Sequence, residues 1–142
     1  MLVRLLYASH LAKGAAANVV DSILQQSRVK NPMLGITGLL CHDGSVFMQV
    51  LEGGREPVSA LYNRIAADPR HERVTILSFE DISERCFSGW TMGLVDLAKV
   101  NPGMLLKYSE KAVLDPYAVP GSASLSLLKE MIVTAQIIGR AG

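Results

Sequence analysis

The stretch LGITGLLCHDGSVFMQVLE, residues 34–52, holds two apolar runs on either side of Asp43-Gly44. Asp-Gly between two such runs is the strongest short-range signal for a β-hairpin, because both residues tolerate the backbone of a tight turn. We therefore expect one strand from about Leu34 to His42 and its partner from about Ser45 to Glu52. Residues 46–51 are apolar on both faces of the second strand, so both faces of the sheet need covering.

The segments around this hairpin predict a β-α-β-β-α-β-β order. Helices are indicated where apolar residues recur every three or four positions, and prolines bound them, since the residue before a proline is disfavoured in a helix. The expected elements are a strand over residues 2–9, a helix from about Ala15 to Arg28 ended by Asn31-Pro32, a helix that starts near Pro57 and stops at Asp68-Pro69, and strands over 73–82 and 87–95. The predicted fold is α+β, a ferredoxin-like βαββαββ sandwich with a C-terminal helical cap.

The cap is expected because these two helices can cover only one face of the sheet. A helix over about residues 124–138 is predicted by apolar residues at helical spacing, namely Leu125, Leu128, Ile132 and Ala135. We therefore divide the chain into a core domain, residues 1–96, and a C-terminal helical cap or extension, residues 97–142. An apolar capping helix also favours a homo-oligomer, because large exposed apolar surfaces are common subunit contacts.

Composition narrows the range of functions. The chain has 142 residues, which suits one main core, and its 14 Lys and Arg balance 13 Asp and Glu. This balance argues against nucleic acid as a partner, because phosphate binding needs a clustered basic surface. No apolar run is long enough to span a bilayer and no secretion signal is recognisable, so we expect no membrane association. Two distant cysteines, Cys41 and Cys86, favour a reducing, cytoplasmic location.

Two polar side chains are expected inside the core. Gln49 shares a strand face with Phe47 and Leu51, and a buried amide must find hydrogen-bond partners. Tyr7 ends the first strand on the same face as Val3, and its hydroxyl needs a partner as well. Spacing leaves two interpretations open with equal weight: the two side chains only bond to each other in a core, or they serve a ligand.

A charged cluster stands at the end of the second predicted helix. Arg64 and Asp68 are four residues apart, and Arg70 and His71 follow directly. A surface ion pair with solvated charges explains this spacing and is the more common outcome. The alternative is a polar rim around a ring system held between the two helices, with Asn31 contributed by the first helix.

Other candidate chemistry is weaker. Trp90 and Met92 alternate on the predicted last strand, where core packing accounts for them. Cys41-His42 lacks the spacing of metal ligands, so no metal site is expected. The chain contains no nucleophile elbow, P-loop or GxGxxG motif.

Six motifs follow one another in a fixed order: RLLYAS at residues 4–9, Asn31, GITGLL at 35–40, FMQVLEG at 47–53, DPRH at 68–71 and FSGWTM at 87–92. In this order they resemble the BLUF family, the sensors of blue light using FAD, over about residues 2–96. The tail, with LKYS at 106–109 and LLKE at 127–130, is similar to the short stand-alone members of the PixD type. The resemblance implies a blue-light photoreceptor, not an enzyme, which signals to a downstream partner protein that the sequence does not identify.

The resemblance also implies a role for each candidate residue. A flavin, FAD with FMN or riboflavin as alternatives, is implied between the two helices without covalent attachment. Tyr7 is then the electron and proton donor, and Gln49 is the switchable amide between Tyr7 and the flavin. The implied flavin contacts are Asn31, Arg64 and Asp68 at the polar edge of the ring, Ile23, Phe47 and Ile65 packed on it, Ser27 near it, and Arg70 and His71 towards the ribityl phosphate. Trp90 and Met92 lie on the strand implied to change with light, and Met92 also borders the flavin.

Two positions depart from the family pattern, and two other functions remain open. Lys30 stands where some relatives have asparagine, and His10 stands where arginine is common. An acylphosphatase-like enzyme shares the predicted fold, although the chain shows no glycine-rich phosphate loop near its first strand. A flavin-free, ferredoxin-like interaction module is the second alternative. The colour of the purified protein distinguishes all three, because only a flavoprotein is yellow.

Overall fold

Antiparallel pairing of β1 (Leu2–Leu11) with β3 (Val46–Gly54) forms the centre of the sheet in the computed structural model, which describes residues 1–14 and 18–134. β4 (His71–Ile82) pairs with β1 on one side, and β2 (Thr37–Asp43) pairs with β3 on the other. β5 (Gly93–Asp96) adds a parallel strand beside β2, so the strand order is β4-β1-β3-β2-β5. The predicted ferredoxin-like α+β fold is confirmed, with the added strand at the β2 edge.

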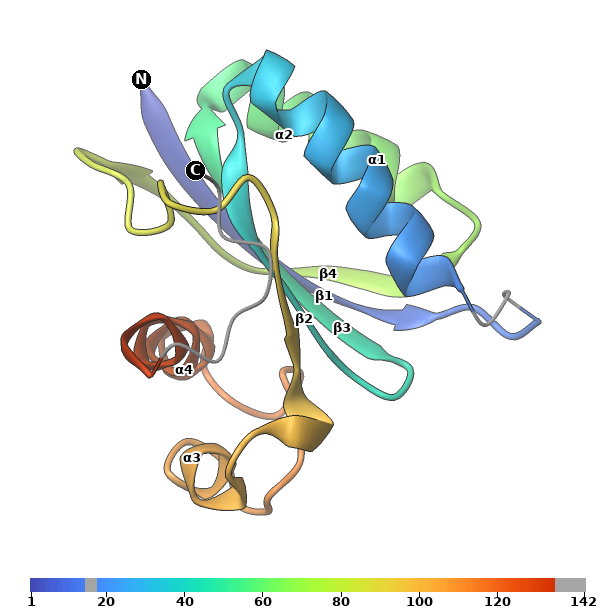
Figure 1. Ribbon diagram of the computed structural model, residues 1–142, viewed down its shortest axis with the longest axis vertical. Coiled ribbons are helices and arrows are strands. Elements are labelled where there is room, and N and C mark those ends of the chain that lie inside the picture. Colours follow the sequence, from blue (N-terminus) through green and yellow to red (C-terminus); the bar gives the residue numbers. More distant parts are fainter. Residues whose placement is uncertain (15–17, 135–142) are drawn as a thin grey trace.

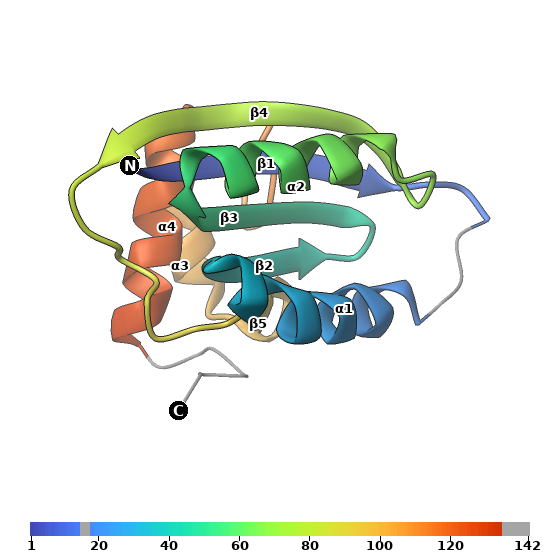
Figure 2. The same ribbon diagram turned by 90° about the horizontal axis from the view of Figure 1, so that it is seen from above.

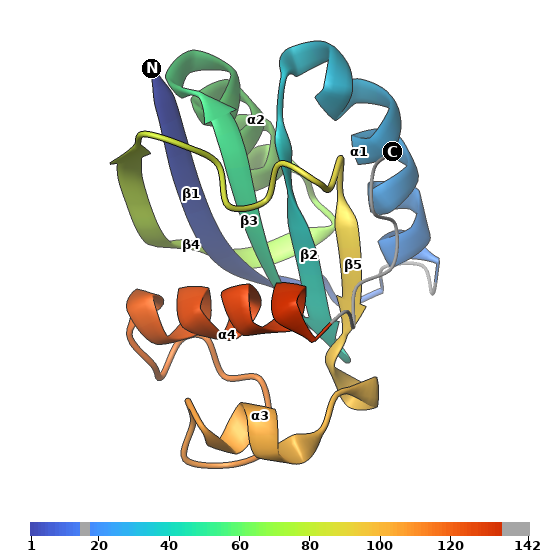
Figure 3. The same cartoon turned by 60° about the vertical axis from the view of Figure 1, so that its left-hand side comes forward.

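The helices lie on opposite faces of this sheet. α1 (Val19–Leu34) and α2 (Arg55–Ala67) run along one face of the sheet (Figures 1 and 2). A short 3-10 turn (Leu97–Lys99), α3 (Pro102–Leu106) and α4 (Gly121–Val133) follow β5, and α4 crosses the strands on the second face (Figure 3). We call the first the helix face and the second the cap face.

Each face of the sheet buries its own set of apolar side chains. Along β3, Phe47 and Leu51 point to the helix face, whereas Met48 and Val50 point to the cap face, as the two-residue period of a strand requires. On the cap face these residues pack with Leu127, Leu128 and Met131 of α4. The predicted second cover is therefore present, although α4 begins at Gly121 rather than near residue 124. Residues 135–138 of the predicted helix lie outside the described residues.

The hairpin has the predicted turn but a shorter first strand. Gly44 adopts a positive φ of 58°, which glycine accepts without strain. β2 begins at Thr37 rather than near Leu34, because α1 continues to Leu34 and Gly35 then ends it with a left-handed φ of 69°. Gly38 brings β2 unusually close to β3, since a Cβ there would lie 1.9 Å from the Val50 carbonyl oxygen.

Asn31-Pro32 does not end α1, contrary to the prediction. The proline lies in the last turn of the helix, where its missing N–H removes one hydrogen bond and leaves the rest of the helix intact. The carbonyl oxygens of Asn31 and Pro32 accept hydrogen bonds from Ile36 and Gly35, which close the helix end. The helix starts at Val19, and residues 15–17 of the predicted start lie outside the described residues.

The predicted strand over residues 87–95 is also wrong, because β5 starts only at Gly93. Residues 83–92, which we call the connector, cross the cap face without regular structure (Figure 3). The backbone N–H groups of Cys86 and Phe87 donate to the Glu52 carboxylate rather than to a neighbouring strand. Trp90 and Met92 therefore belong to the connector and not to a strand.

Candidate functional site

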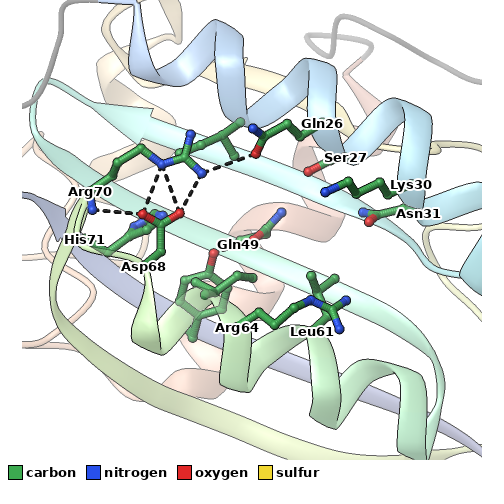
Figure 4. A pocket seen from close by; sticks show the side chains of 13 residues that line it. Gln26, Ser27, Lys30, Asn31, Gln49, Leu61, Arg64, Asp68, Arg70 and His71 are labelled. Atoms are coloured by element: carbon green, nitrogen blue, oxygen red, sulfur yellow. Dashed lines mark hydrogen bonds and ion pairs between the residues drawn. The ribbon is translucent and has the colours of Figure 1, made fainter.

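A cavity opens between α1 and α2 on the helix face (Figure 4). Tyr7 of β1 and Gln49 of β3 form its floor, and apolar side chains from the two helices, Ile23, Leu61 and Ile65, form its walls. Polar side chains surround the opening: Gln26, Ser27, Lys30 and Asn31 from α1, and Arg64, Asp68, Arg70 and His71 from α2 and the segment after it. An apolar slot with polar groups on its rim suits a flat heteroaromatic ligand.

The floor of the cavity is a hydrogen-bonded pair. Tyr7 and Gln49 stand opposite each other in the β1–β3 register, and the Tyr7 hydroxyl donates to Oε1 of Gln49. Both side chains are buried, with relative exposures of 1% and 2%. Burial, with smaller contributions from Tyr62 and Asp68, raises the pKa of the Tyr7 phenol, so it stays protonated and acts as a donor.

Gln49 also contacts the connector. Its Nε2 donates to the sulfur of Met92 at 3.3 Å, and the Met92 carbonyl accepts from Nε of Arg28 on α1 at 3.3 Å. Met92 is fully buried on the helix face, whereas Trp90 packs into the core of the cap face. Two residues of one segment therefore reach opposite sides of the sheet.

Asn31 offers an amide group to the cavity. Its side chain is 2% exposed, and its Nδ2 has no hydrogen-bond partner among residues 1–14 and 18–134. A buried amide without a partner costs stability, so this atom fits a ligand that brings an acceptor. Together with the slot and the polar rim, it satisfies what a flavin ring requires: apolar walls and a donor for a ring oxygen or nitrogen.

The charged cluster after α2 forms a different ion pair from the one the spacing favoured. Asp68 pairs with Arg70, at 2.9 Å from Oδ2 to Nε and 2.6 Å to Nη2, and this guanidinium extends to Gln26 at 3.3 Å (Figure 4). The expected Arg64–Asp68 pair does not form. Asp68 is the C-cap of the helix and has an extended backbone, so it does not lie one helical turn after Arg64. The hydrogen bond from Arg70 holds the pKa of the Asp68 carboxyl below its usual value. Arg64 is exposed at the rim.

His71 lines the cavity next to this ion pair and packs against Phe47. Nδ1 of His71 lies 2.9 Å from the Ser9 hydroxyl, and its ring packs edge-on against Phe47 at 5.8 Å between centroids. Burial lowers the pKa of His71; the Asp68 charge opposes this shift and the Arg70 charge adds to it. Phe47 is fully buried beneath His71 and does not line the cavity.

Most residues expected at the site do meet there. Ten of them line the cavity: Tyr7, Ile23, Ser27, Asn31, Gln49, Arg64, Ile65, Asp68, Arg70 and His71. Met92 is in contact through Gln49, and Trp90 is on the other face. The sequence interpretation missed Gln26, Lys30 and Leu61 as lining residues. Helical spacing could have found them, because Gln26 and Lys30 are three and seven positions after Ile23 and Leu61 is four before Ile65.

Two properties of the described residues bear on other functions. No group of three metal-ligating side chains comes together in residues 1–14 and 18–134. Within the same ranges, no helix has the length and apolar character needed to cross a membrane.

The fold and the site define a ferredoxin-like domain with a slot suited to a flat aromatic ligand between two helices, above a phenol–amide pair. The BLUF family model, described as sensors of blue-light using FAD, matches residues 2–93. The chain belongs to the BLUF family. It is therefore a flavin-binding sensor domain for blue light, and the predicted family is confirmed.

Relatives and solved structures agree with this assignment. The blue light- and temperature-regulated antirepressor BluF of Escherichia coli (strain K12) is 33% identical over 97 residues, 68% of this chain and 24% of that protein. The photoactivated adenylate cyclase subunit beta of Euglena gracilis is 35% identical over 92 residues, 64% of this chain and 11% of that protein. The chain thus spans about a quarter or less of these curated relatives.

Two solved structures match the chain over most of its length. The photo-activated state of BlsA has a TM-score of 0.82 at 29% identity, and the match covers 94% of this chain and 96% of that one. The dark state of BlrB, a BLUF protein, has a TM-score of 0.77 at 30% identity with the same coverage. The structural likeness therefore extends past the family domain into the cap.

Proposed function

We propose that the chain holds FAD non-covalently in the cavity between α1 and α2, and that Tyr7 and Gln49 form its light switch. The observation that carries this proposal is the continuous contact from the Tyr7 hydroxyl through the Gln49 amide to the Met92 sulfur. A flavin excited by blue light supplies an oxidant strong enough to take an electron from a nearby phenol. Tyr7 supplies that electron, and its proton passes along the existing hydrogen bond to Gln49.

The Gln49 amide acts as the switch because its two ends differ. Oε1 accepts hydrogen bonds and Nε2 donates them, so a rotation or tautomerisation changes what the side chain offers to Tyr7, to Met92 and to the cavity. With a flavin bound, a stronger hydrogen bond from Gln49 to a ring carbonyl would lower the energy of the excited state and shift the absorption slightly to the red. The same change alters the contact with Met92 and thereby reaches the connector.

The remaining cavity residues have proposed binding roles that follow from their positions. Nδ2 of Asn31 supplies a buried donor to the polar edge of the ring, and Arg64 and Asp68 supply further polar contacts from the α2 side. Ile23 and Ile65 pack on the faces of the ring from opposite helices, with Ser27 beside them. Arg70, paired with Asp68, and His71 would lie towards the ribityl-phosphate side of a bound flavin, as the family resemblance implies.

The wider biological role is also a proposal. Residues 1–96 act as the sensory part and residues 97–142 as an extension that carries the signal to a homo-oligomer contact and to a partner protein. The antirepressor name of the Escherichia coli relative supports a partner that controls transcription. Cys41 and Cys86 are both free thiols, which supports a cytoplasmic setting.

Absorption spectroscopy of the purified protein tests this proposal. We expect a yellow protein whose spectrum shifts reversibly to the red under blue light and returns in the dark. Chromatography of the flavin released by denaturation then distinguishes FAD, FMN and riboflavin. A colourless protein that does not take up added flavin would contradict the proposal.

A further inference from the structure

Glu52 carries a fully buried carboxylate on β3, three residues after Gln49. Because side chains alternate along a strand, Glu52 points to the cap face and Gln49 to the helix face. The Glu52 side chain is 0% exposed, and a buried charge is costly unless it is paired and hydrogen-bonded. Three donors meet it: Nε of Arg4 at 2.8 Å, the N–H of Cys86 at 3.0 Å and the N–H of Phe87 at 2.6 Å.

Arg4 completes this arrangement from the neighbouring strand. Its Nη1 binds Glu80 at 2.8 Å, and its Nη2 lies 3.0 Å from the sulfur of Cys86. Burial alone lowers the pKa of Arg4. The hydrogen bonds to Glu52 and Glu80 together have the opposite and larger effect, so the pKa is raised overall. Arg4 therefore stays charged. We call Glu52, Arg4 and the backbone of Cys86 and Phe87 the Glu52 anchor.

The connector runs from this anchor to the Gln49 switch. The Phe87 carbonyl accepts from the N–H of Trp90 at 3.2 Å, and the Trp90 carbonyl accepts from the N–H of Gly38 at 3.0 Å. Two residues later the sulfur of Met92 contacts Nε2 of Gln49. One strand, β3, thus holds the middle of the connector, at Cys86 and Phe87, with Glu52 and touches its end with Gln49.

We propose that Glu52, held by Arg4, is a positioning residue for the light switch. It fixes the connector at Cys86 and Phe87, so that a change in the Gln49 amide displaces Met92 and Trp90 relative to a fixed point. The anchor also favours the dark arrangement, and it therefore shortens the life of the light state. This inference rests on the proposed function, in which Gln49 changes with light, although neither Glu52 nor Arg4 lines the flavin cavity.

The variant Glu52→Gln tests the proposal in the flavin-loaded chain. It keeps the side-chain volume but removes the charge, and a single amide oxygen cannot serve the three donors that the two carboxylate oxygens serve. We expect the light-induced red shift to remain and its recovery in the dark to slow by about tenfold, a change of about 1.4 kcal/mol in the barrier. Trp90 is the single tryptophan of the chain, so its quenching by acrylamide reports on the connector and should increase in the dark protein.

Arg55→Gln is the matched control, because it breaks an exposed ion pair of the same length, the Arg55–Asp81 pair at 2.8 Å, which joins the start of α2 to β4 and does not touch the connector. It should leave both recovery and quenching as in the parent. If Glu52→Gln does not fold, Glu80→Gln replaces it, since Glu80 is a half-exposed partner of Arg4 and a milder slowing of about threefold is expected.

The outcomes separate this inference from the proposed function. The inference is wrong if neither the dark recovery nor the Trp90 quenching changes in Glu52→Gln. A lower unfolding temperature alone would not support the inference, because loss of a purely structural ion pair would also lower it. Faster recovery would also overturn the inference. A parent that shows no red shift would instead contradict the proposed function, and Trp90 quenching would still decide whether Glu52 fixes the connector.

Discussion

The Tyr7 hydroxyl and the Gln49 amide meet directly across two central strands, with the hydroxyl as donor and Oε1 as acceptor. Both side chains are almost completely buried, with relative exposures of 1% and 2%, so little water can replace either partner when the bond changes. If one side chain changes its hydrogen bond, the other side chain or a ligand in the cavity above them must therefore supply the new partner. The first two predictions follow from this dependence.

Removal of the Tyr7 hydroxyl should abolish the light response and leave flavin binding intact. Tyr7→Phe keeps the ring that forms the cavity floor but removes the proposed electron and proton donor. We expect a yellow protein without the reversible red shift, measured as a light-minus-dark absorption spectrum. Tyr62→Phe is the control, because Tyr62 packs edge-on against Tyr7 at 5.7 Å and leaves its hydroxyl bond untouched. A normal red shift in Tyr7→Phe would remove Tyr7 from the mechanism.

Gln49→Leu should retain the flavin and lose the light state. Leucine has a similar volume but neither accepts from Tyr7 nor donates to Met92, so the proposed switch is absent. The dark absorption spectrum should also move slightly, since a hydrogen bond to the ring is lost. Gln26→Leu removes an exposed amide from the cavity rim and should photocycle like the parent. If Gln49→Leu photocycles normally, the switch lies elsewhere.

Asn31→Ala should weaken flavin binding by roughly 5- to 150-fold, because losing the partner of a buried polar group costs about 1–3 kcal/mol. Titration of the flavin-free protein with FAD measures the change. Arg64→Ala should also weaken binding, but less, because Arg64 is exposed at the rim. Asn63→Ala, which removes an exposed amide from the same helix as Arg64, is the control. Equal affinities for Asn31→Ala and this control would remove Asn31 from the binding site.

Acidification should destabilise the protein through His71. Its pKa is lowered by burial from the ordinary value of 6.5, so the folded state prefers the neutral ring. The contribution of the neutral His71 ring to stability is therefore complete above about pH 6.5. It is lost as the pH falls through the lower pKa that His71 has in the folded state. Melting temperatures measured from about pH 8 to about pH 5 should fall less steeply for His71→Asn than for the parent. Identical slopes would assign the pH dependence to other groups.

Met92→Leu should change the recovery of the light state without removing the initial red shift. The substitution keeps an apolar side chain of similar size but replaces the sulfur that accepts from Gln49. Dark-recovery kinetics and size-exclusion chromatography in dark and light are the measurements. Met33→Leu, at a position that is 84% exposed, is the control. If Met92→Leu matches it in both experiments, the signal leaves through the helices rather than the connector.

The sequence predicts the parts of the fold that repeat regularly. Alternation along Val46 to Leu51 and the Asp43-Gly44 turn were sufficient to place the hairpin and to predict a cover on each face. The same alternation put the Gln49 and Tyr7 side chains on one face, where the structure joins them. These features depend on neighbours along one strand or one helix, which is the information that spacing contains.

The errors fall where distant residues decide the local structure. Phe87 to Met92 has the composition of a strand, yet the Glu52 carboxylate takes the N–H of Phe87, and no spacing rule connects residues 35 positions apart. Asn31-Pro32 was expected to stop α1, but a proline in the last turn is tolerated when a glycine such as Gly35 closes the helix next to it. The expected Arg64–Asp68 pair is absent because α2 ends at Ala67, one residue before Asp68.

The sheet separates two cores that share no side chains, one below the cavity and one below α4. Flavin absorbance consequently reports mainly on the first, so a thermal melt followed by colour will follow the helix face. A melt followed by Trp90 fluorescence will report on the cap face, because the indole is packed with Leu127 and Leu128. Comparing the two melts on one sample will measure how tightly the halves of this small protein are thermodynamically joined.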